Sequence, residues 1–190
     1  MIMKIKSDFV TNSSSTSFFF IIKGGTKEDL FRALVNNPDR FILTCSWRSD
    51  YSSNSVYDLI EEMDHIFTTD PNQWQKEYYY QPPSLRPITE LVESFSKTEG
   101  YYNKIITGII PTDDRDDYAK EIYIEEKERC DYRKEKVLEA IRNGFTHYIE
   151  ISFGNDGTIP NGGVSEALDS DGASTEIYVD DLYVFTKSNH

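Results

Sequence analysis

The chain is 190 residues long, and its 33 acidic and 20 basic side chains give a formal net charge of −13. This length suits a single domain, and a composition with 38% hydrophobic and 14% aromatic residues excludes wholesale disorder. The charge argues against direct binding to nucleic acid, whose phosphates need clustered Lys and Arg, and against docking on an anionic membrane.

Cysteine usage and the N-terminal pattern indicate a cytoplasmic protein. The two cysteines, Cys45 and Cys130, form no Cys-x-x-Cys pair, which predicts two ordinary thiols rather than a disulfide framework. The first apolar run, Phe18–Ile22, spans five residues. A signal peptide needs about 7–15 apolar residues and a membrane-spanning helix about 20, so we expect neither an export signal nor a transmembrane segment.

The N-terminal third of the chain predicts a buried strand followed by a helix. Residues 16–23 contain an apolar run without polar alternation, which is typical of a strand buried on both faces. The glycine pair 24–25 ends this strand. Thr26 is placed to cap a helix that closes at residues 36–38, where two asparagines and a proline follow one another. A second strand is expected over 41–47.

Two helices and one further strand are predicted in the middle of the chain. Apolar side chains recur from Val56 at the spacing of one helical face, which predicts a helix over 56–67. A third helix is expected over about 87–97, with a proline in its first turn. Residues 70–86 are predicted to be irregular, and residues 104–110 to form a strand.

A long and heavily charged helix is predicted over 113–143. Gly144 follows it, at the position where a helix C-terminus favours glycine. At 1.5 Å per residue this helix is about 45 Å long. Because its middle carries almost only charged residues, we expect it to project, to cross the surface or to break.

Strands and turns dominate the C-terminal part. Residues 146–153 alternate as a half-buried strand does, and further strands are expected at 175–179 and 182–186, with a short helical piece at 165–168. The pattern predicts one α+β domain over 1–190. It would hold a mixed sheet of about five strands with three or four helices, one of them the long charged helix.

A distinctive string, SDFVTNSSSTSF, occupies residues 7–18. It resembles the opening of a set of uncharacterised bacterial, archaeal and phage proteins that begin with a version of SDFVTNSSSSSF, from which it departs at Thr16. The resemblance covers about residues 6–18. It implies kinship and a microbial or phage origin, and it implies no activity.

Hydroxyl and amide side chains fill the middle of this string. One interpretation is a loop whose side chains hydrogen-bond its own backbone. Another is a cradle for an anion or small ligand, although the frame of a phosphate-binding loop is absent. A processing site is the third. The residues of this possible ligand segment are Asn12, Ser13, Ser14 and Ser15.

Carboxylates dominate the C-terminal quarter, where eight of them lie between Asn143 and Thr186 without any Lys or Arg. This region would be a solvated acidic surface, a site for a divalent cation, or a negative surface that binds a basic partner or imitates nucleic acid. The spacing departs from that of an EF-hand, and we expect no metal. The expected partner-binding residues are Glu166, Asp169, Asp171, Glu176, Asp180 and Asp181.

Tyrosines crowd the middle of the chain. Tyr and Trp are enriched in protein interfaces, because they offer large amphipathic contact areas. The alternative is that many of these rings pack on the core and hydrogen-bond through their hydroxyls. The expected aromatic contact residues are Tyr78, Tyr79 and Tyr80.

No catalytic constellation emerges from the sequence. The three histidines, His65, His147 and His190, stand in no metal-binding spacing, and neither cysteine has a nucleophile signature. The sequence therefore leans against an enzyme and predicts no cofactor.

Three functions stay open at this point. The first is an acidic interaction protein that binds a protein partner, with a basic surface on that partner as one option, and that inhibits a nucleic-acid-handling complex. The second is a small enzyme or ligand-binding domain that uses residues 11–17. The third is a component of a homo-oligomer, with residues 113–143 as a contact arm.

Overall fold

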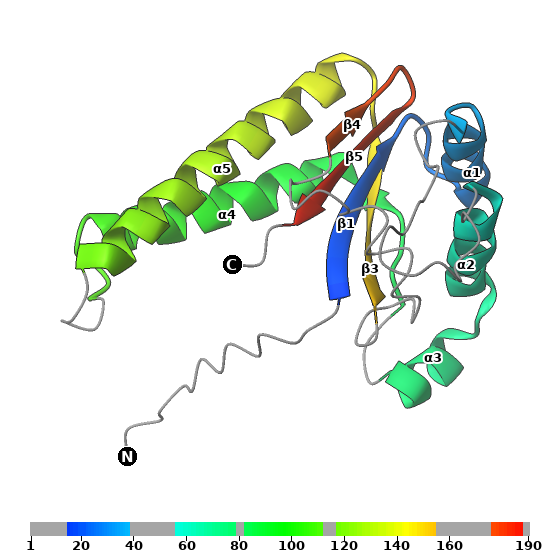
Figure 1. The fold of residues 1–190 in the computed structure, drawn as a ribbon, viewed down its shortest axis with the longest axis horizontal. Coiled ribbons are helices and arrows are strands. Elements are labelled where there is room, and N and C mark those ends of the chain that lie inside the picture. Colours follow the sequence, from blue (N-terminus) through cyan, green and yellow to red (C-terminus); the bar gives the residue numbers. More distant parts are fainter. Residues whose placement is uncertain (1–14, 39–55, 79–81, 112–116, 155–175, 188–190) are drawn as a thin grey trace, which may run out of the picture.

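The central element of the molecule is strand β1 (Ser15–Ile22), which pairs with a strand on each side (Figure 1). The computed structural model describes residues 15–38, 56–78, 82–111, 117–154 and 176–187. Within these ranges the strand order is β2-β3-β1-β5-β4, and all pairings are antiparallel. The other strands are β2 (Arg86–Pro87), β3 (His147–Gly154), β4 (Glu176–Tyr178) and β5 (Leu182–Lys187).

Strand β1 is buried on both faces, as its uninterrupted apolar run predicts. Side chains alternate between the two faces of a strand, so Phe18 and Phe20 belong to one core cluster and Phe19 and Ile21 to another. All four side chains are at most 6% exposed. This strand therefore contributes to two separate cores, one on each face of the sheet.

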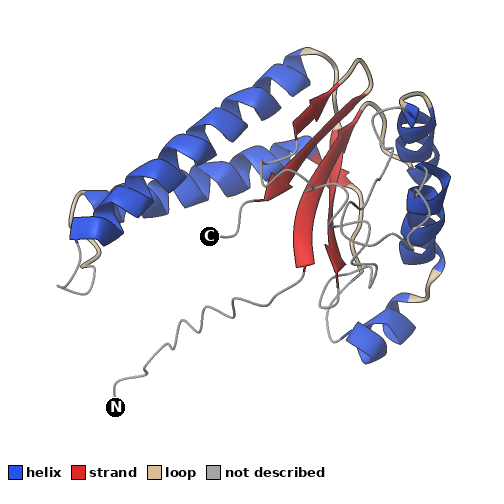
Figure 2. Cartoon of the chain, in the orientation of Figure 1, coloured by secondary structure: helices blue, strands red, loops and turns tan. Residues whose placement is uncertain are grey.

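Helices cover both faces of the sheet (Figure 2). The first three pack on the face of Phe18 and Phe20, and the last two pack on the face of Phe19 and Ile21. The result is a three-layer α+β architecture. The helices are α1 (Lys27–Val35), α2 (Val56–Thr68), α3 (Pro71–Tyr78), α4 (Ile88–Ile106) and α5 (Asp117–Arg142).

Side-chain hydrogen bonds fix the turn between β1 and α1. Thr26 and Asp29 form a reciprocal capping box at the start of α1. The Thr26 hydroxyl donates to Asp29 Oδ2 at 2.8 Å, and this bond holds the pKa of the Asp29 carboxyl below its usual value. On the other side of the turn, the Thr146 hydroxyl donates to the Gly24 carbonyl at 2.9 Å and accepts from the Gly24 N–H at 3.1 Å.

The predicted class and strand number are confirmed, with a regular antiparallel sheet where a mixed one was expected. The helices predicted at 56–67 and 113–143 correspond to α2 and α5. The expected strand at 41–47 and the helical piece at 165–168 lie outside the described residues. None of the described helices has the length and apolar character needed to cross a membrane.

Helix α4 overturns the predicted strand at 104–110. The helix begins near the expected position and continues to Ile106, so Gly100 lies inside it rather than at its end. Ile105 is 2% exposed, and the Tyr102 ring lies 6.0 Å from the Tyr123 ring of α5. Packing against α5 thus outweighs both the glycine and the β-branched isoleucines, because tertiary context overrides weak local propensity.

Helix α3 was also missed, since residues 70–86 were predicted to be irregular. Asp70 Oδ1 accepts hydrogen bonds from the backbone N–H groups of Asn72 and Gln73, at 2.9 and 3.1 Å, and so caps this helix. Pro71 is its first residue, a position that suits proline. Trp74 anchors the helix in the core of the α1–α2 layer, where it is fully buried.

Candidate functional site

Helix α5 forms one half of a helical hairpin with α4, and the two helices lie side by side and extend past the sheet (Figure 1). Its inner face carries Cys130, Val137 and Ala140, all of which are buried. Its outer face points away from α4, and Tyr132 on this face reaches the edge of the sheet. This outer face carries exposed acidic and aromatic side chains, which are features of a binding surface.

Five glutamates and one tyrosine follow one another along the outer face of α5. They recur at intervals of four and three residues, the spacing that keeps side chains on one side of a helix. The first five members are exposed and the last is half-buried. We refer to this set as the acidic stripe, which consists of Glu121, Glu125, Glu128, Tyr132, Glu135 and Glu139.

Most of the negative charge of the stripe is not neutralised within the described part of the chain. Glu125 lies 3.8 Å from Arg129, and Glu139 lies 3.3 Å from Lys136. Among the described residues, the other three stripe glutamates form no ion pair. Exposed ion pairs contribute little free energy, so the paired glutamates also remain accessible to another molecule.

A hydrogen-bonded cluster connects the stripe to the edge of the sheet. The hydroxyl groups of Tyr132 and Tyr183 donate hydrogen bonds to the two carboxylate oxygens of Glu176, at 3.1 and 3.0 Å. Burial, with Glu176 as a further cause, raises the pKa of Tyr183 far above its usual value. The bond to Glu176 also raises the pKa of Tyr132. Glu176 therefore joins α5, β4 and β5.

The raised pKa of Tyr183 predicts a loss of stability at high pH. The unfolded chain releases this proton near pH 10, whereas the folded chain retains it, so the free energy of unfolding falls as the pH rises above about 10. In Tyr183→Phe this fall should be less steep by up to about 1.4 kcal/mol per pH unit. Urea unfolding at several pH values measures it, with the exposed Tyr57→Phe as control. An unchanged slope in Tyr183→Phe would contradict the assignment.

Three of the six carboxylates expected to bind a partner lie in the described residues. Glu176 accepts hydrogen bonds from the hydroxyls of Tyr132 and Tyr183. Asp181 accepts hydrogen bonds from the side-chain amides of Asn36 and Asn37, both at 3.0 Å, and so secures the end of α1. Asp180 is exposed. Glu176 and Asp181 thus contact helices of opposite layers, while Glu166, Asp169 and Asp171 lie outside the described residues.

The other expected contact residues are only partly described. Tyr78 is the last residue of α3, and Tyr79 and Tyr80 lie outside the described residues. In the hydroxyl-rich segment, Ser15 opens β1 opposite Gly154 of β3. Asn12, Ser13 and Ser14 lie outside the described residues.

The acidic stripe itself was not predicted as a site, although its signal is present in the sequence. The 4-3-4-3-4 spacing of its members can be read directly from residues 121–139. The stripe is inconspicuous in the sequence because α5 as a whole also carries many basic residues. Only the separation of those residues by helix face reveals the stripe.

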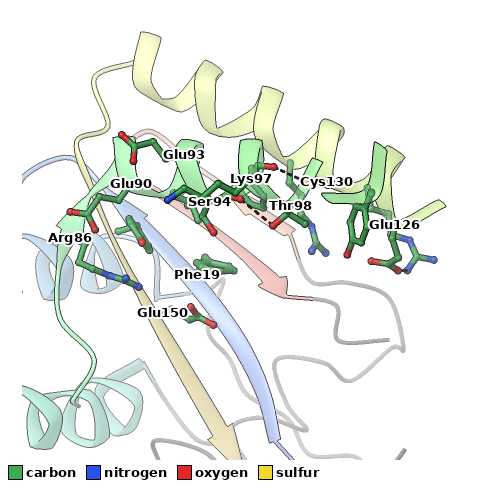
Figure 3. Close-up of a pocket in the computed structure, with 16 residues that line it drawn as sticks. Phe19, Arg86, Glu90, Glu93, Ser94, Lys97, Thr98, Glu126, Cys130 and Glu150 are labelled. Atoms are coloured by element: carbon green, nitrogen blue, oxygen red, sulfur yellow. Dashed lines mark hydrogen bonds and ion pairs between the residues drawn. The ribbon is translucent and has the colours of Figure 1, made fainter. Parts of the chain in front are cut away.

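A groove lies beneath the hairpin, on the side of α5 opposite the stripe (Figure 3). Its volume is about 540 Å³, and Phe19 and Tyr148 of the sheet contribute to its floor. The Arg86 guanidinium lies 4.8 Å from the centre of the Tyr148 ring, and that of Arg133 lies 5.5 Å from the centre of the Phe185 ring. Each cation is therefore held against an aromatic side chain. Both arginines also line the groove.

Cys130 is a buried thiol in the wall of this groove. Its Sγ donates to the carbonyl of Phe95 at 3.5 Å, and burial raises its pKa. A raised pKa disfavours the thiolate, which is the nucleophilic form. The residue therefore packs between α4 and α5, with the protonated thiol as its favoured form.

The described histidines take part in local contacts. The His65 ring lies 6.3 Å from the Trp74 ring, and His147 Nδ1 lies 3.0 Å from the Thr146 hydroxyl oxygen. Within the described ranges, no group of three or more His, Cys, Asp or Glu side chains is arranged to hold a metal ion.

Comparison with known proteins adds no relative. No protein-family model matches the chain, and no curated protein or solved structure matches it.

Proposed function

We propose that this protein is an interaction protein that binds a basic protein surface through the outer face of α5. The observation that carries the proposal is the acidic stripe, a row of five glutamates and one tyrosine along the helix, of which only Glu139 is half-buried. The net charge of −13 supports it, because a negative field attracts a basic partner over a long range.

Apolar and aromatic side chains give the stripe more than charge. Tyr132, at its centre, is 52% exposed, and Ile122 and Ile124, nearer the N-terminal end of α5, are 39% and 42% exposed. Aromatic anchors contribute much of the affinity of protein interfaces, while charges mainly set the association rate and the choice of partner. The outer face of α5 combines both kinds of group.

The row of negative charge along the stripe favours a partner that normally holds nucleic acid. Its members follow one another about once per helical turn, or about every 5 Å along the axis. A nucleic-acid strand carries one phosphate for about every 3.4 Å of rise. The two spacings differ, so the stripe resembles a nucleic-acid strand in its row of negative charge and not in its exact spacing. A basic groove built for a row of phosphates would accept such a row of carboxylates, and the protein would inhibit nucleic-acid binding by occupying the groove.

Affinity capture with matched variants tests this proposal. The full chain would be incubated with a microbial lysate at about 0.15 M salt and captured proteins identified by mass spectrometry. The test variant is the triple Glu121→Gln, Glu128→Gln and Glu135→Gln, because these three carboxylates have no ion pair among the described residues. The control triple removes equal charge elsewhere, at the exposed residues Glu28, Glu61 and Glu93.

We expect the stripe triple to weaken binding of a basic partner about tenfold or more, and the control triple to change it by less than about twofold. An excess of single-stranded DNA should displace the protein from its partner. Equal losses with both triples, or capture that survives about 0.5 M salt, would contradict the proposal.

A second candidate is self-association through the distal end of the hairpin. Ile109 is 72% exposed and Tyr101 is 50% exposed, and both lie at the end of α4 or just beyond it. Exposed apolar groups of this kind mark interaction sites. A molar mass that rises with concentration in light scattering, and that returns to the monomer value in Ile109→Ser, would favour this candidate.

A further inference from the structure

The groove beneath the hairpin contains a half-buried cation, the guanidinium of Arg133. Arg133 projects from α5 and is half-buried, and it forms no ion pair within the described part of the chain. Glu126 is the acidic neighbour that acts on it, and that carboxylate is already bound to Arg129 at 2.9 Å. The opposite end of the groove differs, because Glu90 and Glu150 lie near Arg86 and Tyr148 there.

This arrangement is costly unless an anion completes it. Burial lowers the pKa of Arg133, because removing a cation from water without a partner is unfavourable. The guanidinium is held over the Phe185 ring, which limits its freedom before any ligand arrives. A fixed guanidinium presents paired N–H donors that match the oxygens of a carboxylate or a phosphate.

Part of the groove suits the body of an organic molecule, because apolar and aromatic side chains lie among its polar lining residues: Phe19, Leu91, Phe95 and Tyr102. The Phe19 ring lies close to both rings that the two arginines contact. Its centre is 5.0 Å from that of Phe185 and 6.1 Å from that of Tyr148. In Figure 3, Phe19 lies between the sheet and α4, with Ser94 and Thr98 on the helix beside it. The volume of about 540 Å³ falls within the range of small-molecule sites.

We propose that this groove binds a small organic anion, with its carboxylate or phosphate on Arg133 and its apolar body along Phe19 and α4. This site goes beyond the proposed function, because it lies on the side of α5 opposite the acidic stripe. Neither a bare anion nor an uncharged ring satisfies both halves of the groove. Binding therefore requires the two groups in one molecule.

Nuclear magnetic resonance tests this on the full ¹⁵N-labelled chain. Phenyl phosphate and benzoate would be titrated separately, which distinguishes a phosphate from a carboxylate ligand. Inorganic phosphate and benzyl alcohol are the probes that lack the ring or the charge. We expect saturable shifts of the Arg133 side-chain signal and of the Phe19 and Phe185 amides with at least one of the two aromatic anions. That anion should bind about tenfold or more tightly than either incomplete probe.

Arg133→Gln should weaken this binding about tenfold or more. Arg142→Gln, at an exposed position in the last turn of the same helix, should leave it unchanged within about twofold. Arg133→Lys retains the charge without the paired donors and should give an intermediate loss, with circular dichroism reporting whether each variant is folded. The absence of saturable groove shifts at about 10 mM of either aromatic anion, or an equal loss in Arg142→Gln, would overturn the proposal.

Discussion

Trp74→Ala should lower the free energy of unfolding by about 3–5 kcal/mol, because it removes a fully buried indole from the core between the sheet and α1–α3. Urea unfolding followed by far-UV circular dichroism measures the loss. Trp74→Phe retains an aromatic ring in the same place and should cost only about 1–2 kcal/mol. A loss below about 1 kcal/mol in Trp74→Ala would contradict the docking of α3 on this core.

Gly24→Ala should cost about 2–4 kcal/mol, through backbone strain and loss of the helix cap. Gly24 has a φ of +106°, and an added Cβ would overlap the Asp29 side chain that caps α1. Gly144 is the matched control, since its φ is +86° and no atom lies within 4 Å of its added Cβ. Gly144→Ala should therefore show the strain alone, about 1–2 kcal/mol.

The same urea unfolding series compares these two glycine variants. The difference between their losses of unfolding free energy gives the contribution of the capping box. Gly24→Ala alone combines that contribution with the backbone strain. Equal losses would mean that the Asp29 side chain moves aside without cost, and that the capping box contributes little to α1.

The elements with strong periodicity were predictable from the sequence. The apolar run of β1, the capping residues of α1 and the apolar stripe of α2 each depend on neighbouring residues along the chain. Local pattern and tertiary environment agree in these elements, as they do in most natural sequences. Their positions could therefore be derived without knowing what packs against them.

The two elements that were predicted wrongly, α3 and the second half of α4, depend on contacts with residues far along the chain. The second half of α4 carries a glycine and several β-branched residues, and it is helical because Ile105 is buried and Tyr102 packs toward Tyr123 of α5. In α3, the buried Trp74 supplies an anchor that no periodic pattern predicts. In both cases packing determines that the segment is helical, and local propensity contains no information about that packing.

The two candidate sites differ in the same way. The acidic stripe lies on one helix, so its spacing is visible in the sequence. The groove draws Arg86 from the two-residue strand β2, Phe19 from β1 and Arg133 from α5. Only the packing of the hairpin on the sheet brings these three together, and no sequence pattern contains that information.

Site-specific photo-crosslinking tests the role of the outer face of α5 most directly. A photoreactive amino acid would replace Glu128, within the acidic stripe, in the full chain, and Glu61 of α2, exposed on the opposite layer, in a matched chain. After illumination in a microbial lysate, we predict a covalent adduct with a basic protein from position 128 and none from position 61. The same adduct from position 61, or its persistence when Glu121 and Glu135 are neutralised, would contradict binding through the stripe.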